Sequence, residues 1–393
     1  MSSEGAAPRA GGASGNPRGW KLRDAFGRNR TRGPQAAAAT AEPAAPTQRR
    51  WLRRHWILAS VVTVVLVVAG GAGGWLYYLN SLIDNVHRVQ LTLPNNTRPP
   101  VTTSKALNIL IAGADNGPGP SIAADVAAGR WEPGQHRSDT IMILHIPADR
   151  SKAYLVSIPR DSYVKLYNGH GKYTYTDKIN AAFSLYGPSG YLSTVEHLTG
   201  LRMSHLAIID WQGFKDISTA LGGVRICIPH TFYDDSQKIT WHQGCQNLEG
   251  EQALQYVRTR HGLTNGDFDR IKRQQNFLRA MMGQLLSRGT LASPTKLTST
   301  LGAITKNLTV SSDWSTSDIR NLAFSLRSMS TADVTFLTAP MKKYATTDSG
   351  ASVVVLARKQ SHALWQAISD DHIAGYLAKY GDKTLLGSPS SVR

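Results

Sequence analysis

The stretch ALNILIAGAD, residues 106–115, decides the fold class of this chain. It is a nearly continuous apolar run that ends in glycine and an acid, which is typical of a strand buried on both faces of a sheet. Runs of the same kind recur as DTIMILHIP (139–147), AYLVSIPRD (153–161), SHLAIID (204–210), GGVRICIP (222–229) and VTFLTAP (334–340). These runs predict the strands of one central sheet.

Amphipathic segments with helical spacing lie between and after these runs. The clearest span 250–260, 268–288, 293–308, 315–329 and 361–371. Strands that alternate with helices predict an α/β/α sandwich with a mixed central sheet.

A long apolar segment precedes the predicted sheet. WILASVVTVVLVVAGGAGGWLYYL, Trp56–Leu79, has 24 residues without charge, enough to cross a bilayer as one helix. A cleaved signal peptide is disfavoured, because the run is too long and begins more than 50 residues into the chain. Arg49, Arg50, Arg53 and Arg54 precede it, so the positive-inside rule places the N-terminus in the cytoplasm and residues 80–393 outside the cell membrane.

Domain boundaries follow from these changes in composition. We predict a disordered basic cytoplasmic tail (1–55), a transmembrane helix (56–79), an extracellular stalk (80–104), a folded domain (105–375) and a C-terminal tail (376–393).

The net charge of +17 raises the possibility of a nucleic-acid partner. Its distribution argues against one, since residues 1–56 hold 11 Lys and Arg against 3 Asp and Glu, about half of the excess. The tail shows no apolar periodicity that a DNA-binding helix pair would need. We therefore expect no nucleic acid.

The only two cysteines, Cys227 and Cys245, fall in the part predicted to lie outside the cell. An exported pair usually forms a disulfide, which we predict here; two separate buried thiols are the alternative.

Charged side chains gather where the predicted strands end, which is where sheets of this class bind ligands. Asp115 ends the first strand, Pro159-Arg160-Asp161 ends the third, and Arg137 and Asp139 stand at the start of the second. Further cations follow in DKINAAF and in YVRTRHGLTNGDFDRIKRQ (256–274). The set of six is Arg137, Arg160, Lys178, Arg258, Arg260 and Arg270.

Any one of these cations could simply be solvated. Six in one pocket would repel one another unless anions met them. Arginine forks match phosphate oxygens in pairs. Asp115, Asp139 and Asp267 could hold Mg²⁺ together with a substrate phosphate. On a helix, Asp267, Arg270 and Gln274 would share one face. The set therefore predicts a phosphoryl-transfer site.

Seven ordered motifs give the chain a strong resemblance to the LytR-CpsA-Psr proteins. They are GAD, RSDT, SIPRD, DKINAAF, ALGGV, LEGEQALQYVRTR and GDFDRIKRQQNFL. The resemblance covers about 105–375, is densest over 137–280 and includes the single N-terminal span. That family transfers glycopolymers from a polyprenyl-pyrophosphate carrier onto peptidoglycan, and some members hydrolyse the pyrophosphate. The implied fold is an α/β/α sandwich with an apolar tunnel for the polyprenyl chain.

The resemblance also implies residue roles. Asp115 and Asp139 match the family's positions for magnesium, or manganese. The residues that match the family's pyrophosphate-contacting positions are Arg137, Arg160, Lys178, Arg258, Arg260, Arg270 and Gln274. Asp267 matches the acid of the family motif D-x-x-R-x-x-R-Q. One departure is the long link NGPGPSIAADVAAGRWEPGQH between Asp115 and Arg137, which lacks the family's usual arginine soon after the first acid.

The function implied is that of a membrane-anchored phosphotransferase on the outer face of a Gram-positive cell membrane. Its donor would be a polyprenyl-pyrophosphate-linked glycopolymer, its acceptor peptidoglycan, and the polymer a teichoic acid, arabinogalactan, capsule or other wall glycan. Asp161 is a candidate acceptor base. Two alternatives stay open: a membrane-bound pyrophosphatase or phosphodiesterase that uses water, and a non-catalytic wall-polymer-binding or regulatory protein.

Overall fold

The computed structural model describes residues 48–101, 104–116, 122–259 and 267–388. The chain divides into two compact units, Met1–Val65 and Leu66–Arg393, and the second holds the sheet. The N-terminal helix α1, Gln48–Asp84, contains the predicted span. Its part Ala59–Asp84 is long and apolar enough to cross a membrane, and none of its most apolar window is buried.

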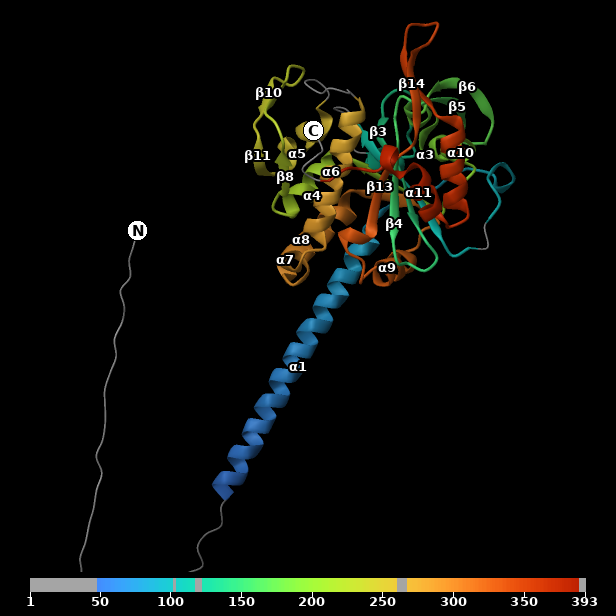
Figure 1. The fold of residues 1–393 in the computed structure, drawn as a ribbon. Helices are drawn as coiled ribbons and strands as arrows, with labels where there is room; N and C mark the ends of the chain where they lie inside the picture. Colours follow the sequence, from blue (N-terminus) through green and yellow to red (C-terminus); the bar gives the residue numbers. More distant parts are fainter. Residues whose placement is uncertain (1–47, 102–103, 117–121, 260–266, 389–393) are drawn as a thin grey trace, which may run out of the picture. The chain divides into compact units, whose positions relative to one another are not determined.

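A seven-stranded sheet forms the centre of the second unit (Figure 1). Its order is β1-β12-β7-β2-β3-β4-β13. The strands are β1 (His87–Val89), β2 (Leu107–Asp115), β3 (Arg137–Ile146), β4 (Ala153–Ile158), β7 (His205–Asp210), β12 (Leu308–Ser311) and β13 (Val334–Thr338). Because β2 runs parallel to β7 and antiparallel to β3, the sheet is mixed, which confirms the predicted fold class.

Both faces of the sheet are covered, as the continuous apolar runs require. Leu110 and Ala112 of β2 pack into a core with α3 (Asn180–Thr199), α10 (Arg358–Ser369) and α11 (Ile373–Thr384). Ile109 and Ile111, which alternate with them, face the side of α6 (Asp267–Leu285) and α9 (Thr316–Ser325). Figure 1 shows these helices on opposite sides of the sheet. The remaining helices are α2 (Ile122–Ala127), α4 (Trp211–Ala220), α5 (Gly250–Arg258), α7 (Arg288–Leu291) and α8 (Pro294–Asn307).

Four hairpins stand outside the central sheet in the described residues. They pair β5 (Tyr163–Tyr167) with β6 (Tyr173–Lys178), β8 (Val224–Ile228) with β11 (Gly244–Leu248), β9 (Phe232–Asp234) with β10 (Ile239–Trp241), and β14 (Met341–Thr346) with β15 (Ser352–Leu356). The prediction that 222–229 is a strand of the central sheet was therefore wrong. Buried and exposed residues alternate along β8, which is the pattern of a strand with one face in solvent.

Cys227 and Cys245 lie directly opposite each other in the β8–β11 hairpin. The structure joins them by a disulfide across the two strands, with a sequence separation of 18. The bond lies on the exposed face of β8 and fixes the register of the hairpin.

The predicted stalk needs correction, because part of it belongs to the folded unit. His87–Val89 form the edge strand β1, parallel to β12. Further along, the Arg98 guanidinium donates to the buried Glu196 carboxylate of α3, with Nη2 2.7 Å from Oε1. A three-residue strand carries too little pattern to be found in a polar, proline-rich sequence. The predicted tail is also shorter, since α11 continues to Thr384.

Candidate active site

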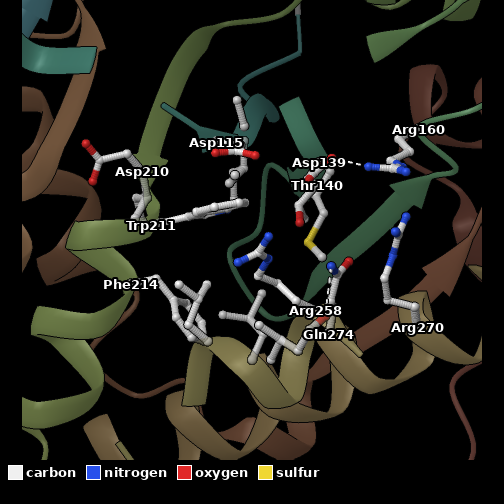
Figure 2. A pocket seen from close by; sticks show the side chains of 18 of the residues that line it. Asp115, Asp139, Thr140, Arg160, Asp210, Trp211, Phe214, Arg258, Arg270 and Gln274 are labelled. Carbon is white, nitrogen blue, oxygen red and sulfur yellow. Dashed lines mark hydrogen bonds and ion pairs between the residues drawn. The ribbon is translucent and has the colours of Figure 1, made fainter. Parts of the chain in front are cut away.

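A cavity of about 600 Å³ opens at the carboxyl ends of β2 and β7, between the sheet and the helices α4, α5 and α6 (Figure 2). Most of the residues predicted from the strand ends and from 256–274 line it. They are Asp115, Arg137, Asp139, Arg160, Arg258, Arg270 and Gln274. Segments from four distant parts of the chain thus meet at one place, although their individual roles stay predictions.

Asp139 reaches the cavity through a β-bulge. In the β2–β3 ladder Gly113 is opposite Thr140 and Ala114 is opposite Ser138, which leaves Asp139 as the extra residue. Bulges re-aim a side chain and are frequent next to active sites. Gly113 is required opposite the bulge, since a Cβ there would lie 2.8 Å from the Cβ of Thr140. The bulge lies where the motif GAD of β2 pairs with the motif RSDT of β3.

A chain of ion pairs leads from Asp139 out of the cavity. Arg160 Nη1 donates to Asp139 Oδ1, and Arg160 Nε lies 3.6 Å from Asp161 Oδ2. Lys178 Nζ lies 3.1 Å from Asp161 Oδ1. Lys178 does not itself line the cavity, but it extends this cluster by one cation. The four side chains keep between 15% and 29% of their surface exposed, so the cluster stands at the mouth of the site.

Arg258, the last residue of α5, is held by stacking. Its guanidinium carbon lies 3.8 Å from the centroid of the Trp211 ring, a cation–π contact that fixes the plane of the fork. Trp211 begins α4, and Asp210 caps that helix by accepting a hydrogen bond from the Gly213 amide at 2.8 Å. Asp210 and Trp211 also line the cavity but were not predicted. Asp210 could have been predicted from the sequence, because it is a charged residue at the end of the apolar run SHLAIID.

Helix α6 supplies Arg270 and Gln274 from one face. Arg270 is buried, and Gln274 Nε2 donates to the Val257 carbonyl at 3.4 Å, which ties α6 to α5. Arg273, one turn on from Arg270, points elsewhere and is fully buried. Its guanidinium lies 4.6 Å from the ring of Phe232 and 4.9 Å from that of Tyr256, and burial lowers the pKa of Arg273.

Two predicted site residues fall on parts of the chain that the structure does not describe. Arg260 lies outside the described residues. Asp267 is the first residue of α6, as predicted for an acid at a helix N-terminus, but its side chain lies outside them as well.

The long link between Asp115 and Arg137 folds against the sheet rather than into the cavity. Its helix α2 carries Asp125, which is buried and accepts a contact from His136 Nε2 at 2.9 Å. Trp131 packs edge-on against Phe183 of α3, with ring centroids 5.1 Å apart. In the described part of this link, the insertion therefore ends in a buried contact between His136 and Asp125, just before Arg137. Residues 117–121 lie outside the described residues.

A large part of the cavity wall is apolar. It is formed by Ile111, Met142, Ile209, Phe214, Ile217, Leu254, Val257, Leu278 and Met281. In Figure 2, Arg160 and Arg270 lie on one side of the cavity, and Trp211 and Phe214 lie on the other. The site thus joins arginines, gathered mainly on one side, to an apolar wall in one space, an arrangement suited to an amphiphilic ligand with an anionic head.

Asp115 and Asp139, the two acids predicted as metal ligands, both line the cavity from neighbouring strands. No group of three or more His, Cys, Asp or Glu side chains with metal-binding geometry occurs in the described residues. Mg²⁺ needs only one or two carboxylates when phosphate oxygens and water complete its shell. The pair on neighbouring strands supplies that number of carboxylates, and Mg²⁺ binding stays a prediction.

Comparison with known proteins places this cavity in a family. The model of the LytR_cpsA_psr family matches residues 80–370. The chain belongs to the LytR-CpsA-Psr family. The match confirms the resemblance and extends it to the segment around β1. The motifs that meet in the cavity are therefore those of a LytR-CpsA-Psr domain.

Similar proteins have names that refer to the cell wall. This chain is 34% identical over 251 residues to the cell wall biosynthesis protein LcpA of Corynebacterium glutamicum, and the match covers 58% of this chain and 48% of that protein. The chain therefore spans about half the length of this relative. It is 30% identical over 277 residues to the polyisoprenyl-teichoic acid–peptidoglycan teichoic acid transferase TagU of Enterococcus faecalis, covering 69% and 82%. The crystal structure of Bacillus subtilis TagV shares its fold, with a TM-score of 0.55 over 69% of this chain and 98% of that one at 20% identity.

Proposed function

We propose that this protein transfers a glycopolymer from a polyprenyl-pyrophosphate carrier onto peptidoglycan. The observation that carries the proposal is the single cavity in which arginines adjoin an apolar chamber. A lipid pyrophosphate has matching parts, with two phosphates for the cations and a prenyl chain for the apolar wall. The name of the TagU relative, a transferase between a polyisoprenyl-linked polymer and peptidoglycan, supports the same reaction.

The reaction is a displacement at the phosphorus that carries the polymer. A peptidoglycan hydroxyl attacks this phosphorus, the bond to the bridging oxygen breaks, and polyprenyl phosphate leaves. The product is a phosphodiester between polymer and peptidoglycan. The hydroxyl proton passes to a base, for which Asp161 at the mouth of the cavity is the candidate.

The arginines act on the charge that moves in this step. Arg160, Arg258 and Arg270 can each donate to equatorial or bridging phosphate oxygens from fixed positions. The Trp211 ring fixes the Arg258 fork, and Asp139 orients Arg160. Bound Mg²⁺, held by Asp115 and Asp139, would supply further positive charge to the phosphate oxygens.

The carrier cannot leave the bilayer, so the site must work at its surface. We infer that α1 anchors the chain in the cell membrane with the N-terminus in the cytoplasm and the LytR-CpsA-Psr domain outside. Protease added to intact protoplasts is expected to remove the domain and leave a short anchored fragment. A fully protected domain would overturn this topology.

The transfer is tested with the full chain in detergent, a polyprenyl-pyrophosphate-linked oligosaccharide and peptidoglycan, with Mg²⁺ or with EDTA. We expect labelled oligosaccharide on peptidoglycan and release of polyprenyl phosphate, both dependent on Mg²⁺. Release without attachment would identify a pyrophosphatase or phosphodiesterase. Binding of the donor without release would leave only a wall-polymer-binding function.

A further inference from the structure

A second hollow lies on the opposite face of the sheet from the cavity. This groove, of about 700 Å³, runs between β5, the C-terminal end of α3 and α10. Its floor includes Val164, Leu201 and Trp365, which belong to the core that covers this face. Figure 1 shows the β5–β6 hairpin, α3 and α10 together on this side. The groove is therefore separated from the cavity by the sheet itself.

The rim of the groove is basic. Lys165 comes from β5, His197 from α3, and Arg358 and His362 from α10. None of the residues that line the groove, all in the described part of the chain, is an Asp or Glu. The nearby acid Asp370 accepts hydrogen bonds from Gln366 at 2.9 and 3.1 Å. A concave surface whose charged residues, Lys165 and Arg358, are both positive attracts an anionic ligand.

Aromatic rings lie on this rim and beside it, since Tyr163 and Tyr167 line the groove and Tyr173 pairs with Tyr167 across the hairpin. Tyr163 and Tyr173 are 42% and 52% exposed. Tyr167 stacks on His197 with ring centroids 3.7 Å apart, and Tyr173 meets Tyr167 at 6.0 Å. Lys165 Nζ lies 5.7 Å from the Tyr173 centroid. Tyrosines held in this way offer rigid, amphipathic faces of the kind on which sugar rings stack, with hydroxyls for hydrogen bonds.

One end of the groove is connected to the charged cluster of the active site through the β5–β6 hairpin. Tyr163 pairs with Lys178 across the β5–β6 hairpin, and Lys178 reaches Asp161 at 3.1 Å. A glycan that extends past Tyr163 at this end of the groove therefore reaches the charged cluster at the mouth of the cavity.

We propose that this groove binds the peptidoglycan acceptor, a glycan whose peptide stems carry carboxylates. The tyrosines would stack on its sugar rings, and Lys165, Arg358 and the two histidines would face its carboxylates. The assignment rests on the proposed transfer function and names the acceptor's place in it. It also assigns a role to strand β5, none of whose residues lines the donor cavity.

The test is a binding measurement without donor. Soluble peptidoglycan fragments are titrated into the full chain in detergent, as wild type and as Lys165→Ala/Arg358→Ala. The control Lys342→Ala/Lys359→Ala removes two exposed lysines that lie outside the groove. We expect about tenfold weaker binding in the groove variant and wild-type binding in the control. Equal affinity of the groove variant and the wild type would overturn the proposal.

Two further probes distinguish the source of the ligand. A neutral chitin oligosaccharide and a soluble anionic wall polymer are titrated alongside. We expect both to bind more weakly than the peptidoglycan fragments. Tighter binding of the wall polymer would assign the groove to the donor's glycan and contradict our proposal.

Kinetics separate failure of the groove from failure of the transfer function. In the groove variant, KM for peptidoglycan is expected to rise about tenfold, with kcat and donor affinity unchanged. If the groove variant transfers normally with an unchanged KM for peptidoglycan, the groove is not the acceptor site. If the wild type binds fragments through the groove but neither transfers nor cleaves the donor, the transfer function fails and the groove stands.

Discussion

The two faces of the central sheet are built differently. On the face of α3, α10 and α11, Leu110, Phe183 and Tyr191 are completely buried in a continuous core. On the face of α4, α5 and α6, the side chains of Ile111, Phe214 and Leu278 surround a cavity instead. The first face stabilises the fold, and the second leaves apolar surface for a ligand. Apolar residues are therefore packed into a core on one face, whereas on the other some are packed around Ile109 and Phe336 and others line the cavity that we propose binds the ligand.

The comparison predicts a large difference between two truncations. Leu110→Ala, in the packed face, should lower the free energy of unfolding by about 2–5 kcal/mol, since it opens a cavity in a close-packed core. Phe214→Ala, beside an existing cavity, should cost clearly less and weaken lipid binding instead. Denaturant unfolding of both variants measures this. Equal losses would show that the second face is not built around an open chamber.

The β8–β11 hairpin beside the cavity should depend on its covalent link. Removing the disulfide by Cys227→Ser/Cys245→Ser is expected to cost about 3 kcal/mol in the chain-entropy model for a separation of 18 residues. Melting with and without reductant checks it. Two labelled thiols in denatured, unreduced wild-type protein would mean that the isolated chain has no such bond.

Asp139, the extra residue of the bulge, is predicted to matter for turnover. Asp139→Asn keeps the shape of the side chain but removes its charge, so kcat should fall about 10²-fold while donor binding and melting temperature stay near wild type. Asp149→Asn, at an exposed turn on the other end of β3, is the matched control. A wild-type rate for Asp139→Asn across a magnesium titration would exclude Asp139 as a metal ligand.

We expect the smallest effect from a change in the cation–π contact between Arg258 and Trp211. Arg258→Lys keeps the positive charge but loses the planar contact and the paired donors. We expect a rise in donor KM of about fivefold, the equivalent of roughly 1 kcal/mol, with an unchanged melting temperature. If lysine replaces arginine without loss, only the charge of Arg258 matters.

Much of this architecture could be predicted, because buried strands have long apolar runs and the charges follow directly at their ends. Asp115 and Arg160 were found in this way. The pattern failed where it was too short, as in β1, or where spacing was misread, as in β8. Buried and exposed residues alternate along β8, because one face of its hairpin is open to solvent.

Other features depend on tertiary contacts. No local pattern shows that Asp139 is the extra residue of a bulge, since this follows from its register with Gly113. Likewise, Arg270 and Arg273 look equivalent in sequence, yet one lines the cavity and the other is enclosed by aromatic rings. The apolar wall, too, combines residues of three strands and three helices, whose inward faces could not be told from ordinary core.

The central claim is that one ligand contacts both the arginines and the apolar wall of the cavity, and affinity as a function of prenyl length tests it most directly. Dissociation constants of geranyl, farnesyl and geranylgeranyl pyrophosphate are measured for the wild type and for Leu278→Trp, which places a larger side chain in the apolar wall. The account predicts affinity that rises with chain length in the wild type. In Leu278→Trp the rise should be lost, while inorganic pyrophosphate binds as before and the melting temperature stays unchanged. Affinity independent of prenyl length in the wild type would contradict the account.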